Sequence, residues 1–328
     1  MNPLLQLRDV MMHFPVRDGL FGSLLVKAVD GVSLEIARGE ALAVIGESGS
    51  GKTTLGRLSL GTIKPTSGQV IFDGEEVGGL RGRDLLAFRR RAQAIFQDPY
   101  SSLDPFMNVF QTLEEPLRVH GLGRGGEREE AVYRVLREVR LSPEEVATKY
   151  PHTLSGGQRQ RVNIARALVL DPEYVVADEP VSMIDVSSRT EILGLLKELQ
   201  RRRGLTILYI THDIATAKNF AERIAVMYLG RIVEAGAASK VVAEPMHPYT
   251  IALIEAVPEL DPSNRIKERS SVSGEQPSRS RIPTGCRFHP RCKSFMPGKC
   301  DVIDPVLIDV GGGRCVACHL YPSTEVKT

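Results

Sequence analysis

The chain has 328 residues, of which 25% are charged, and its formal net charge at neutral pH is only +2. So small a net charge gives no electrostatic footprint for DNA or RNA, and we expect no nucleic-acid partner. No apolar run approaches the roughly 18 residues of a membrane-spanning helix, and the N-terminus lacks the pattern of a signal peptide. These features predict a cytosolic protein with one large domain and an appendage, or with two domains.

Near the N-terminus, a strand, a glycine-rich loop and a helix follow one another directly. Residues 5–10 alternate polar and apolar side chains and predict a strand, while the apolar run 41–45 predicts a strand buried on both faces. A helix is predicted immediately after the loop, and this order is what a phosphate-binding loop requires. We therefore expect a nucleoside triphosphate to be bound by Gly46, Glu47, Ser48, Gly49, Ser50, Gly51, Lys52, Thr53 and Thr54.

The residue types of this loop suit phosphate chemistry. Gly46, Gly49 and Gly51 allow the loop to curl, so that its amides converge on the phosphates at a helix N-terminus. Lys52 would place a point charge on the β- and γ-phosphates, and the Thr53 hydroxyl would ligate Mg²⁺. The alternative is an ordinary glycine turn beside an unrelated lysine, which the strand before it and the helix after it argue against.

Residues 106–152 have a different character from the segments on either side. Val132, Val135, Leu136 and Val139 have the spacing of one helix face, with Arg and Glu on the other face. The Ser-Pro-Glu-Glu sequence at 142–145 combines an N-cap residue with proline at the first helical position. We therefore predict a small helical subdomain, at about 106–152, inserted into an α/β core.

A second anion site is predicted at the start of the next helix. Leu154 is followed by Ser155, Gly156, Gly157 and Gln158, and a Ser-Gly-Gly sequence at a helix N-terminus is suited to bind phosphate. One chain does not need two such sites for one nucleotide, so we expect two chains to pair head to tail. Residues 154–158, called the signature sequence below, would then cap the γ-phosphate held by the other chain. The alternative is a glycine-rich N-cap without a ligand.

Three further polar residues follow predicted strands. Asp178 ends the apolar run 175–177, where its carboxylate would hold Mg²⁺ through water. Glu179 comes next and could polarise the attacking water, although it could also be an ordinary exposed glutamate. His212 could contact the γ-phosphate and orient the water, or could be a turn residue. Gln97 also ends an apolar strand and could reach Mg²⁺ or the water.

Together these motifs resemble the ABC ATPase family, from about residue 5 to residue 236. The resemblance implies an α/β P-loop core with an N-terminal antiparallel β subdomain and the inserted helical subdomain. It also implies that Phe14 stacks on adenine and that residues 182–185 form the D-loop at the dimer interface. Met183 and Ile184 depart from the usual D-loop sequence, whereas Asp185 is kept. We expect this departure to alter communication between the two ATP sites more than ATP binding.

Three additional stretches, 28–33, 97–105 and 244–250, resemble the oligopeptide/dipeptide permease ATPases, and residues 51–57 resemble their F-type member. This resemblance implies an ATP-hydrolysing subunit of a peptide importer, peripheral on the cytoplasmic face of the cell membrane. The implied partners are a second, unlike D-type ATPase subunit, two membrane permease subunits and an extracytoplasmic solute-binding protein. Import of oligosaccharides or nickel is the alternative. A soluble ABC ATPase outside transport is an alternative of another class.

All five cysteines lie near the C-terminus, and such a clustered, odd-numbered set favours metal ligation over disulfides. We place a domain boundary at 258, with an ABC ATPase domain at 1–258 and a cysteine-rich extension at 259–328. The permease resemblance implies a 4Fe–4S cluster on Cys286, Cys292, Cys300 and Cys318, with Cys315 as an extra residue that could take the place of Cys318. A Zn²⁺ site is the competing possibility, although only Cys315 and Cys318 form the CxxC pair that such sites contain. Unligated thiols are the third.

Overall fold

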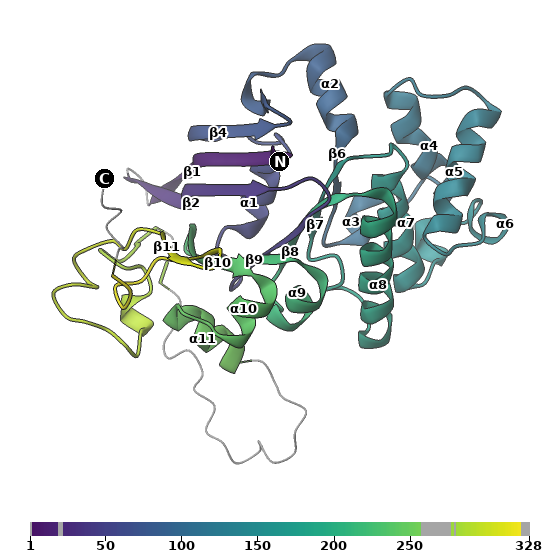
Figure 1. Cartoon of the computed structure of the whole chain (residues 1–328). Helices are drawn as coiled ribbons and strands as arrows, with labels where there is room; N and C mark the ends of the chain where they lie inside the picture. Colours follow the sequence, from purple (N-terminus) through teal and green to yellow (C-terminus); the bar gives the residue numbers. More distant parts are fainter. Residues whose placement is uncertain (1, 19–21, 257–276, 279, 323–328) are drawn as a thin grey trace, which may run out of the picture. The chain divides into compact units, whose positions relative to one another are not determined.

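The computed structural model describes residues 2–18, 22–256, 277–278 and 280–322 (Figure 1). The chain forms two compact units, each assembled from three segments of the sequence. The first unit consists of Met1–Leu4, Ile36–Ala41 and Phe72–Tyr209, and the second of Leu5–Glu35, Leu42–Ile71 and Ile210–Thr328. The domain boundary predicted at residue 258 lies outside the described residues and stays a prediction.

The first unit has a parallel sheet, and helices make up the segment predicted to be helical. Its strands lie in the order β8-β7-β6, and β6 pairs in parallel with β7, so that Ala94 is opposite Val176. Val132, Val135 and Leu136 lie buried along α5, as their helical spacing predicts. The elements are β5 (Glu75–Glu76), η1 (Val77–Gly79), α2 (Gly82–Arg91), β6 (Ala92–Ile95), α3 (Pro99–Ser102), α4 (Val109–Val119), α5 (Gly126–Glu138), α6 (Pro143–Val146), η2 (Pro151–Thr153), α7 (Gly156–Leu168), β7 (Tyr174–Asp178), α8 (Val186–Arg203) and β8 (Thr206–Thr211).

Two sheets contribute to the second unit. In one, strands β1 (Leu5–Asp18), β2 (Gly22–Ile36) and β4 (Ser67–Phe72) lie in the order β2-β1-β4. The connection between β1 and β2 is too short for a crossover, so these neighbouring strands are antiparallel. Strand β1 runs well beyond the predicted residues 5–10. Among its described residues the helices are α1 (Lys52–Ser59), α9 (Ile214–Phe220), α10 (Ala238–Ala243), α11 (Pro248–Glu255) and η4 (His289–Arg291).

The second sheet of this unit includes the C-terminal segment. Its strands lie in the order β11-β12-β10-β9-β3, and β3 pairs in parallel with β9. The C-terminal hairpin β11–β12 extends the sheet, because Val316 pairs antiparallel with Glu234 of β10. The bounds are β3 (Ala41–Ile45), β9 (Arg223–Tyr228), β10 (Arg231–Ala237), β11 (Ile308–Gly311) and β12 (Arg314–Val316).

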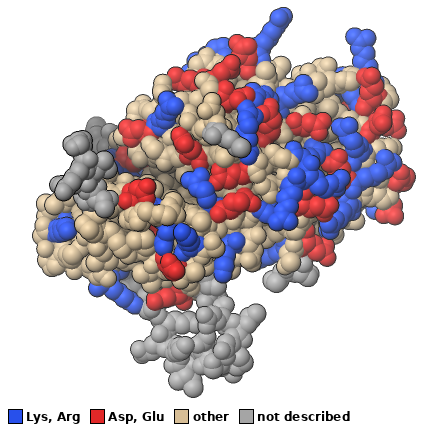
Figure 2. Space-filling view, viewed as in Figure 1, with Lys and Arg blue, Asp and Glu red and all other residues tan. Residues whose placement is uncertain are grey.

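The described surface carries charges of both signs. Figure 2 shows Lys and Arg side chains interspersed with Asp and Glu over the visible face. Some charged side chains of the described residues pair directly, such as Arg140 with Glu198 at 2.6 Å and Arg134 with Asp171 at 3.5 Å. Exposed pairs of this kind each contribute little to stability. Among the described residues, no helix combines the length and apolar character needed to cross a membrane.

Candidate nucleotide site and the C-terminal cysteines

The phosphate loop connects β3 to α1, and backbone contacts at two of its glycines leave no room for a side chain. A Cβ atom at Gly46 would lie 2.1 Å from the carbonyl oxygen of Met227 on β9. At Gly51 a Cβ atom would lie 2.1 Å from the carbonyl oxygen of Ala28 on β2. The proposed binding of phosphate is one reason for glycine at these positions. The structure adds a second reason, which is close packing of the loop against two strands of its own unit.

Lys52 is the first residue of α1, and its ammonium group lies over the loop. Only 5% of the residue is exposed. Its Nζ donates hydrogen bonds to the carbonyl oxygens of Gly46 at 2.8 Å and Glu47 at 2.9 Å. The side chain is therefore held at the N-terminus of an eight-residue helix, where backbone amides and the helix dipole favour an anion.

Glu179 and Gln97 are brought together in the first unit. Glu179 follows β7 with a φ of +44°, a left-handed conformation that is uncommon for residues other than glycine. Gln97 Nε2 donates a hydrogen bond to Glu179 Oε2 at 3.0 Å. The backbone amide and the hydroxyl of Ser182 both donate to the Glu179 carbonyl, at 3.2 and 3.1 Å. These contacts fix the turn that orients the glutamate.

The predicted signature sequence lies at the N-terminus of the 13-residue helix α7. Ser155 is the N-cap, and its hydroxyl accepts a hydrogen bond from the Gln158 amide at 3.2 Å. The Gln158 side chain accepts in turn from the Ser155 amide at 3.1 Å, completing a capping box. Asn163 on the same helix donates to the carbonyl of Phe96, next to Gln97. The signature helix is thereby attached to the segment that carries Gln97.

The remaining predicted site residues are divided between the two units. Asp185 is the N-cap of α8 and accepts a hydrogen bond from the Ser188 amide at 2.9 Å, while Met183 is 60% exposed. His212 is exposed directly after β8, and Phe14 is 37% exposed on β1. His212, Phe14 and the phosphate loop belong to the second unit, whereas Asp178, Glu179 and the signature sequence belong to the first. The roles predicted for them stay predictions.

Two residues of the second unit that the sequence does not identify contact the phosphate loop. Tyr249, in the His-Pro-Tyr segment, accepts a hydrogen bond through its hydroxyl from the Glu47 amide at 2.8 Å. Arg291, in the cysteine-rich extension, donates to both carboxylate oxygens of Glu47, at 2.8 and 2.9 Å. Because these partners are more than 200 positions from Glu47 in the sequence, no local pattern could reveal the contact.

Four of the five thiols lie close enough for their charges to interact. Burial, together with the nearby thiols of Cys318, Cys300 and Cys292, raises the pKa of the Cys286 thiol to about 12. The Cys286 amide also donates to the Cys300 carbonyl at 2.8 Å. Cys315 differs, because it lies on β12 opposite Ala235, and its pKa is raised by burial and by Asp309. Within the described part of the chain, no three His, Cys, Asp or Glu residues are grouped as ligands of a metal ion.

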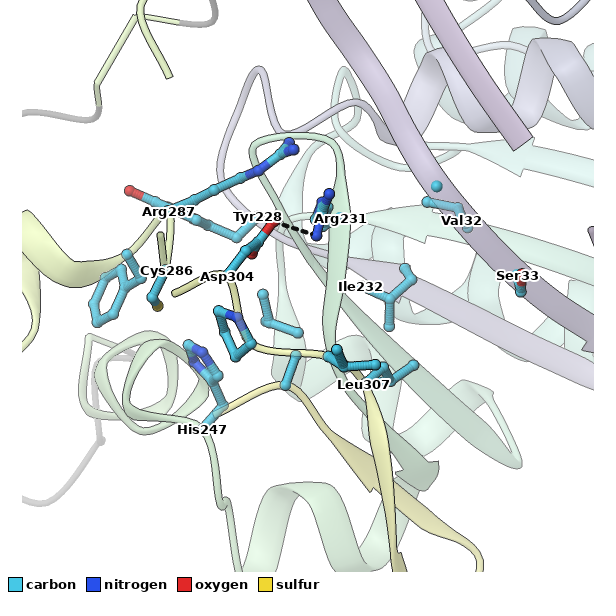
Figure 3. A pocket seen from close by; sticks show the side chains of 16 residues that line it. Val32, Ser33, Tyr228, Arg231, Ile232, His247, Cys286, Arg287, Asp304 and Leu307 are labelled. Carbon is cyan, nitrogen blue, oxygen red and sulfur yellow. Dashed lines mark ion pairs between the residues drawn. The ribbon is translucent and has the colours of Figure 1, made fainter. Parts of the chain in front are cut away.

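A cavity of about 330 Å³ lies where the cysteine-rich segment packs on the sheet of its own unit (Figure 3). Arg287 crosses this region and pairs with the buried Asp30, and Arg231 pairs with Asp304 at 2.6 Å. Burial opposes the ionisation of Asp30, but hydrogen bonds from Arg287 and His13 outweigh it and lower the pKa to about 2. Ion pairs therefore attach the C-terminal segment to β2 and β10.

His247 lines the same cavity and predicts a pH dependence of stability. Burial lowers the pKa of His247 to about 3, and its Nδ1 accepts a hydrogen bond from the Tyr249 amide at 3.0 Å. The unfolded chain binds a proton near the ordinary pKa of 6.5, so the unfolding free energy should fall as pH decreases below that value. Between pH 7 and pH 5, His247 should lower the unfolding free energy by about 2 kcal/mol.

The matched variant is His247→Asn, which keeps an acceptor at the helix N-cap but cannot titrate. Denaturant unfolding at pH 7, 6 and 5 should show a smaller decrease for this variant than for the wild type. Equal decreases in both proteins would contradict a neutral, buried His247.

Two known protein families match this chain, one over the part that carries the glycine-rich loop and the other over the C-terminal part. The family described as ABC transporter matches residues 29–182, and that described as Oligopeptide/dipeptide transporter, C-terminal region, matches residues 233–300. A protein of Brucella ovis named as a peptide import ATP-binding protein is 45% identical, covering 97% of this chain and 98% of its own. The oligopeptide transport ATP-binding protein AppF of Bacillus subtilis is 42% identical, with 97% of each chain covered.

Solved structures of ABC transporter proteins also superpose on this chain. The dimeric post-hydrolysis state of the ATP-binding cassette MJ0796, bound to ADP and Pi, superposes with a TM-score of 0.64 at 32% identity. This superposition covers 71% of this chain and 98% of the MJ0796 chain. The cbiO1 protein of Clostridium perfringens, part of the transporter complex cbiONQ, gives a TM-score of 0.64 at 30% identity, over 74% of this chain and 92% of its own. The predicted α/β ABC ATPase fold is confirmed.

Proposed function

The chain belongs to the ATP-binding subunits of oligopeptide and dipeptide ABC transporters, and we propose that its phosphate loop, β7 end and signature sequence hydrolyse MgATP to drive peptide import. It is an ATPase coupled to solute import. The observation that carries this function is the presence in one chain of the transporter cassette, at 29–182, and the oligopeptide/dipeptide transporter region, at 233–300. The second region argues against a soluble ABC ATPase outside transport.

Phosphoryl transfer requires mainly positioning and charge stabilisation. Lys52 would bind the β- and γ-phosphates, for which its burial over the loop prepares it. Glu179 would polarise the attacking water, with Gln97 holding its carboxylate and His212 contacting the γ-phosphate. Thr53, Gln97 and Asp178 supply oxygen ligands of the kind that Mg²⁺ prefers, and the ion would neutralise charge on the β- and γ-oxygens. Phe14 would stack on the adenine.

Ser155, Gly156, Gly157 and Gln158 would complete the ATP site of a second cassette, with Asp185 near the interface. An unlike D-type subunit is the proposed partner. The pair would work with two permease subunits and an extracytoplasmic solute-binding protein, on the cytoplasmic face of the cell membrane. Closure over ATP and reopening after hydrolysis would switch the permease between inward- and outward-facing states. The dimeric form of MJ0796 supports such pairing.

The cargo is best tested on the assembled transporter. Purified transporter in liposomes should hydrolyse ATP faster when its binding protein carries a peptide, and peptide should accumulate on the side that carries the cassettes. A binding protein that holds an oligosaccharide or nickel and ignores peptides would overturn the peptide assignment, and transport would still be supported. Failure of the chain to associate with any membrane protein would overturn transport itself.

The four neighbouring thiols are the proposed ligands of a 4Fe–4S cluster. All four are free, and their mutual effect on pKa supports a common site. A four-cysteine Zn²⁺ site is expected to contain paired CxxC sequences, and only Cys315 and Cys318 form one, which favours the cluster over zinc. The cluster would cross-link and stabilise the extension.

Anaerobically purified protein should therefore be brown and contain about four irons per chain. Serine at Cys286, Cys292, Cys300 or Cys318 should remove the visible absorbance, whereas Cys315→Ser, the matched control, should retain it. Colourless protein with one zinc would exclude the cluster and favour the zinc site. Colour that depends on Cys315 but not on Cys318 would show that the fourth ligand was misassigned.

A further inference from the structure

Glu47, the second residue of the phosphate loop, is held through every polar group that it has. Its amide donates to the Tyr249 hydroxyl at 2.8 Å, and its carboxylate accepts from Arg291 at 2.8 and 2.9 Å. Its carbonyl oxygen accepts from Lys52 Nζ at 2.9 Å and from the Ser50 amide at 3.1 Å. Glu47, which together with Gly46 fixes the position of the Lys52 ammonium, is therefore itself fixed by two residues from the C-terminal part of the chain.

The ion pair between Arg291 and Glu47 has a rigid geometry. The Arg291 side chain is only 6% exposed, and two of its nitrogens meet the two carboxylate oxygens in parallel, a bidentate geometry that lysine cannot reproduce. The guanidinium carbon lies 6.0 Å from the ring centre of Tyr228 and 5.9 Å from that of Phe288. The hydrogen bonds to Glu47 raise the pKa of Arg291, which stays fully protonated. Aromatic packing and pairing together restrict this side chain to one position.

The Tyr249 hydroxyl is positioned by the same aromatic cluster, which consists of Tyr228, Tyr249 and Phe288. Tyr249 is fully buried at the start of α11, and its ring centre lies 4.6 Å from that of Tyr228 and 5.4 Å from that of Phe288. The Phe288 ring meets Tyr228 edge to face at 5.3 Å. Phe288 and Arg291 lie between Cys286 and Cys292. The cluster therefore connects the cysteine-rich segment directly to the phosphate loop.

We infer that Arg291 and Tyr249 are positioning residues of the ATP site. By fixing Glu47 they fix one of the two carbonyl oxygens that hold Lys52, so the C-terminal segment contributes to nucleotide binding. This inference rests on the proposed function of the phosphate loop. Because coupling between two sites is reciprocal, nucleotide binding should also stabilise residues 286–292. Both residues contact Glu47, and we infer that each acts through it.

The test uses the full chain, purified anaerobically, and MgADP as the probe, so that hydrolysis does not interfere. Calorimetric titration should show that Arg291→Ala weakens MgADP binding about tenfold, equivalent to about 1.4 kcal/mol. Lys293→Ala, which removes an exposed positive charge two positions away, should bind like the wild type. Arg291→Lys should fall between them. Glu47→Gln should weaken binding to a similar extent while leaving the C-terminal segment intact.

Three further readouts separate positioning from a general loss of structure. The double variant Glu47→Gln, Arg291→Ala should bind MgADP no more weakly than whichever single variant has the lower affinity. Both substitutions break the same interaction, the pair between Glu47 and Arg291. In the assembled transporter, Arg291→Ala should raise the KM for ATP about tenfold with kcat nearly unchanged. MgADP should slow amide hydrogen exchange at residues 286–292 in the wild type but not in Arg291→Ala.

Wild-type MgADP affinity in Arg291→Ala and Glu47→Gln would overturn this inference while leaving the proposed function standing. Additive losses in the double variant would also overturn it, because the two residues would then act separately. A wild-type chain that binds no MgADP would overturn both.

Discussion

Replacement of Glu179 by glutamine should lower the ATPase rate of the assembled transporter by about 10²-fold or more, the scale on which a general base contributes. Affinity for MgATP should stay close to that of the wild type. Glutamine has the shape of glutamate but cannot accept the proton of the attacking water. Gln97 donates to the Glu179 carboxylate at 3.0 Å, and it can donate equally to the amide oxygen of the variant. The substitution therefore removes the base and leaves its position unchanged.

The measurement is steady-state phosphate release by the reconstituted transporter, together with nucleotide binding to the same preparation. Glu130→Gln is a matched control, because it makes the same chemical change at an exposed position on α5. It should leave the rate unchanged. Wild-type turnover by Glu179→Gln would show that another group activates the water.

The strand, loop and helix that carry the proposed phosphate site could be predicted because the residues that determine them are close together in the sequence. A buried strand, a loop of fixed glycine spacing and a helix N-terminus follow one another within about 15 residues. The helix α5 was equally predictable, since Val132, Val135 and Leu136 form one buried face. The signature helix likewise begins where Ser155 and Gln158 form a capping box. In each case the residues that determine the structure lie close to one another in the sequence.

The contacts of the C-terminal segment could not be predicted in this way. Glu47 and Arg291 are ordinary charged residues in sequence, and only the folded chain brings them together. The hairpin β11–β12 is formed by strands of four and three residues, too short to show an alternating pattern. Spacing alone also does not separate Cys315 from Cys318, and the choice of ligand between them stays a prediction. Only the folded chain shows that Cys315 lies within a strand, opposite Ala235 on β10.

Replacement of Gly157 by aspartate should stop ATP hydrolysis at the partner's site without weakening nucleotide binding by this chain. The signature loop is proposed to present the α7 N-terminus to a γ-phosphate, and a carboxylate at that position would repel it. Loss of one such anion-stabilising contact costs about 10²–10³-fold in rate. A Cβ at Gly157 would be 3.5 Å from the nearest atom, the Ser188 hydroxyl, so a side chain fits without strain.

Gly157→Ala is the matched control, because it adds the Cβ without the charge and should retain most of the activity. The decisive preparation combines the Gly157→Asp chain with a wild-type partner cassette in the assembled transporter. MgATP binding to the isolated variant chain should equal that of the wild type, since its own phosphate loop is unchanged, while turnover at the partner's site should be lost. Hydrolysis at the wild-type rate would mean that the signature sequence serves no second nucleotide, and robust ATPase activity from a demonstrated monomer would contradict head-to-tail pairing directly.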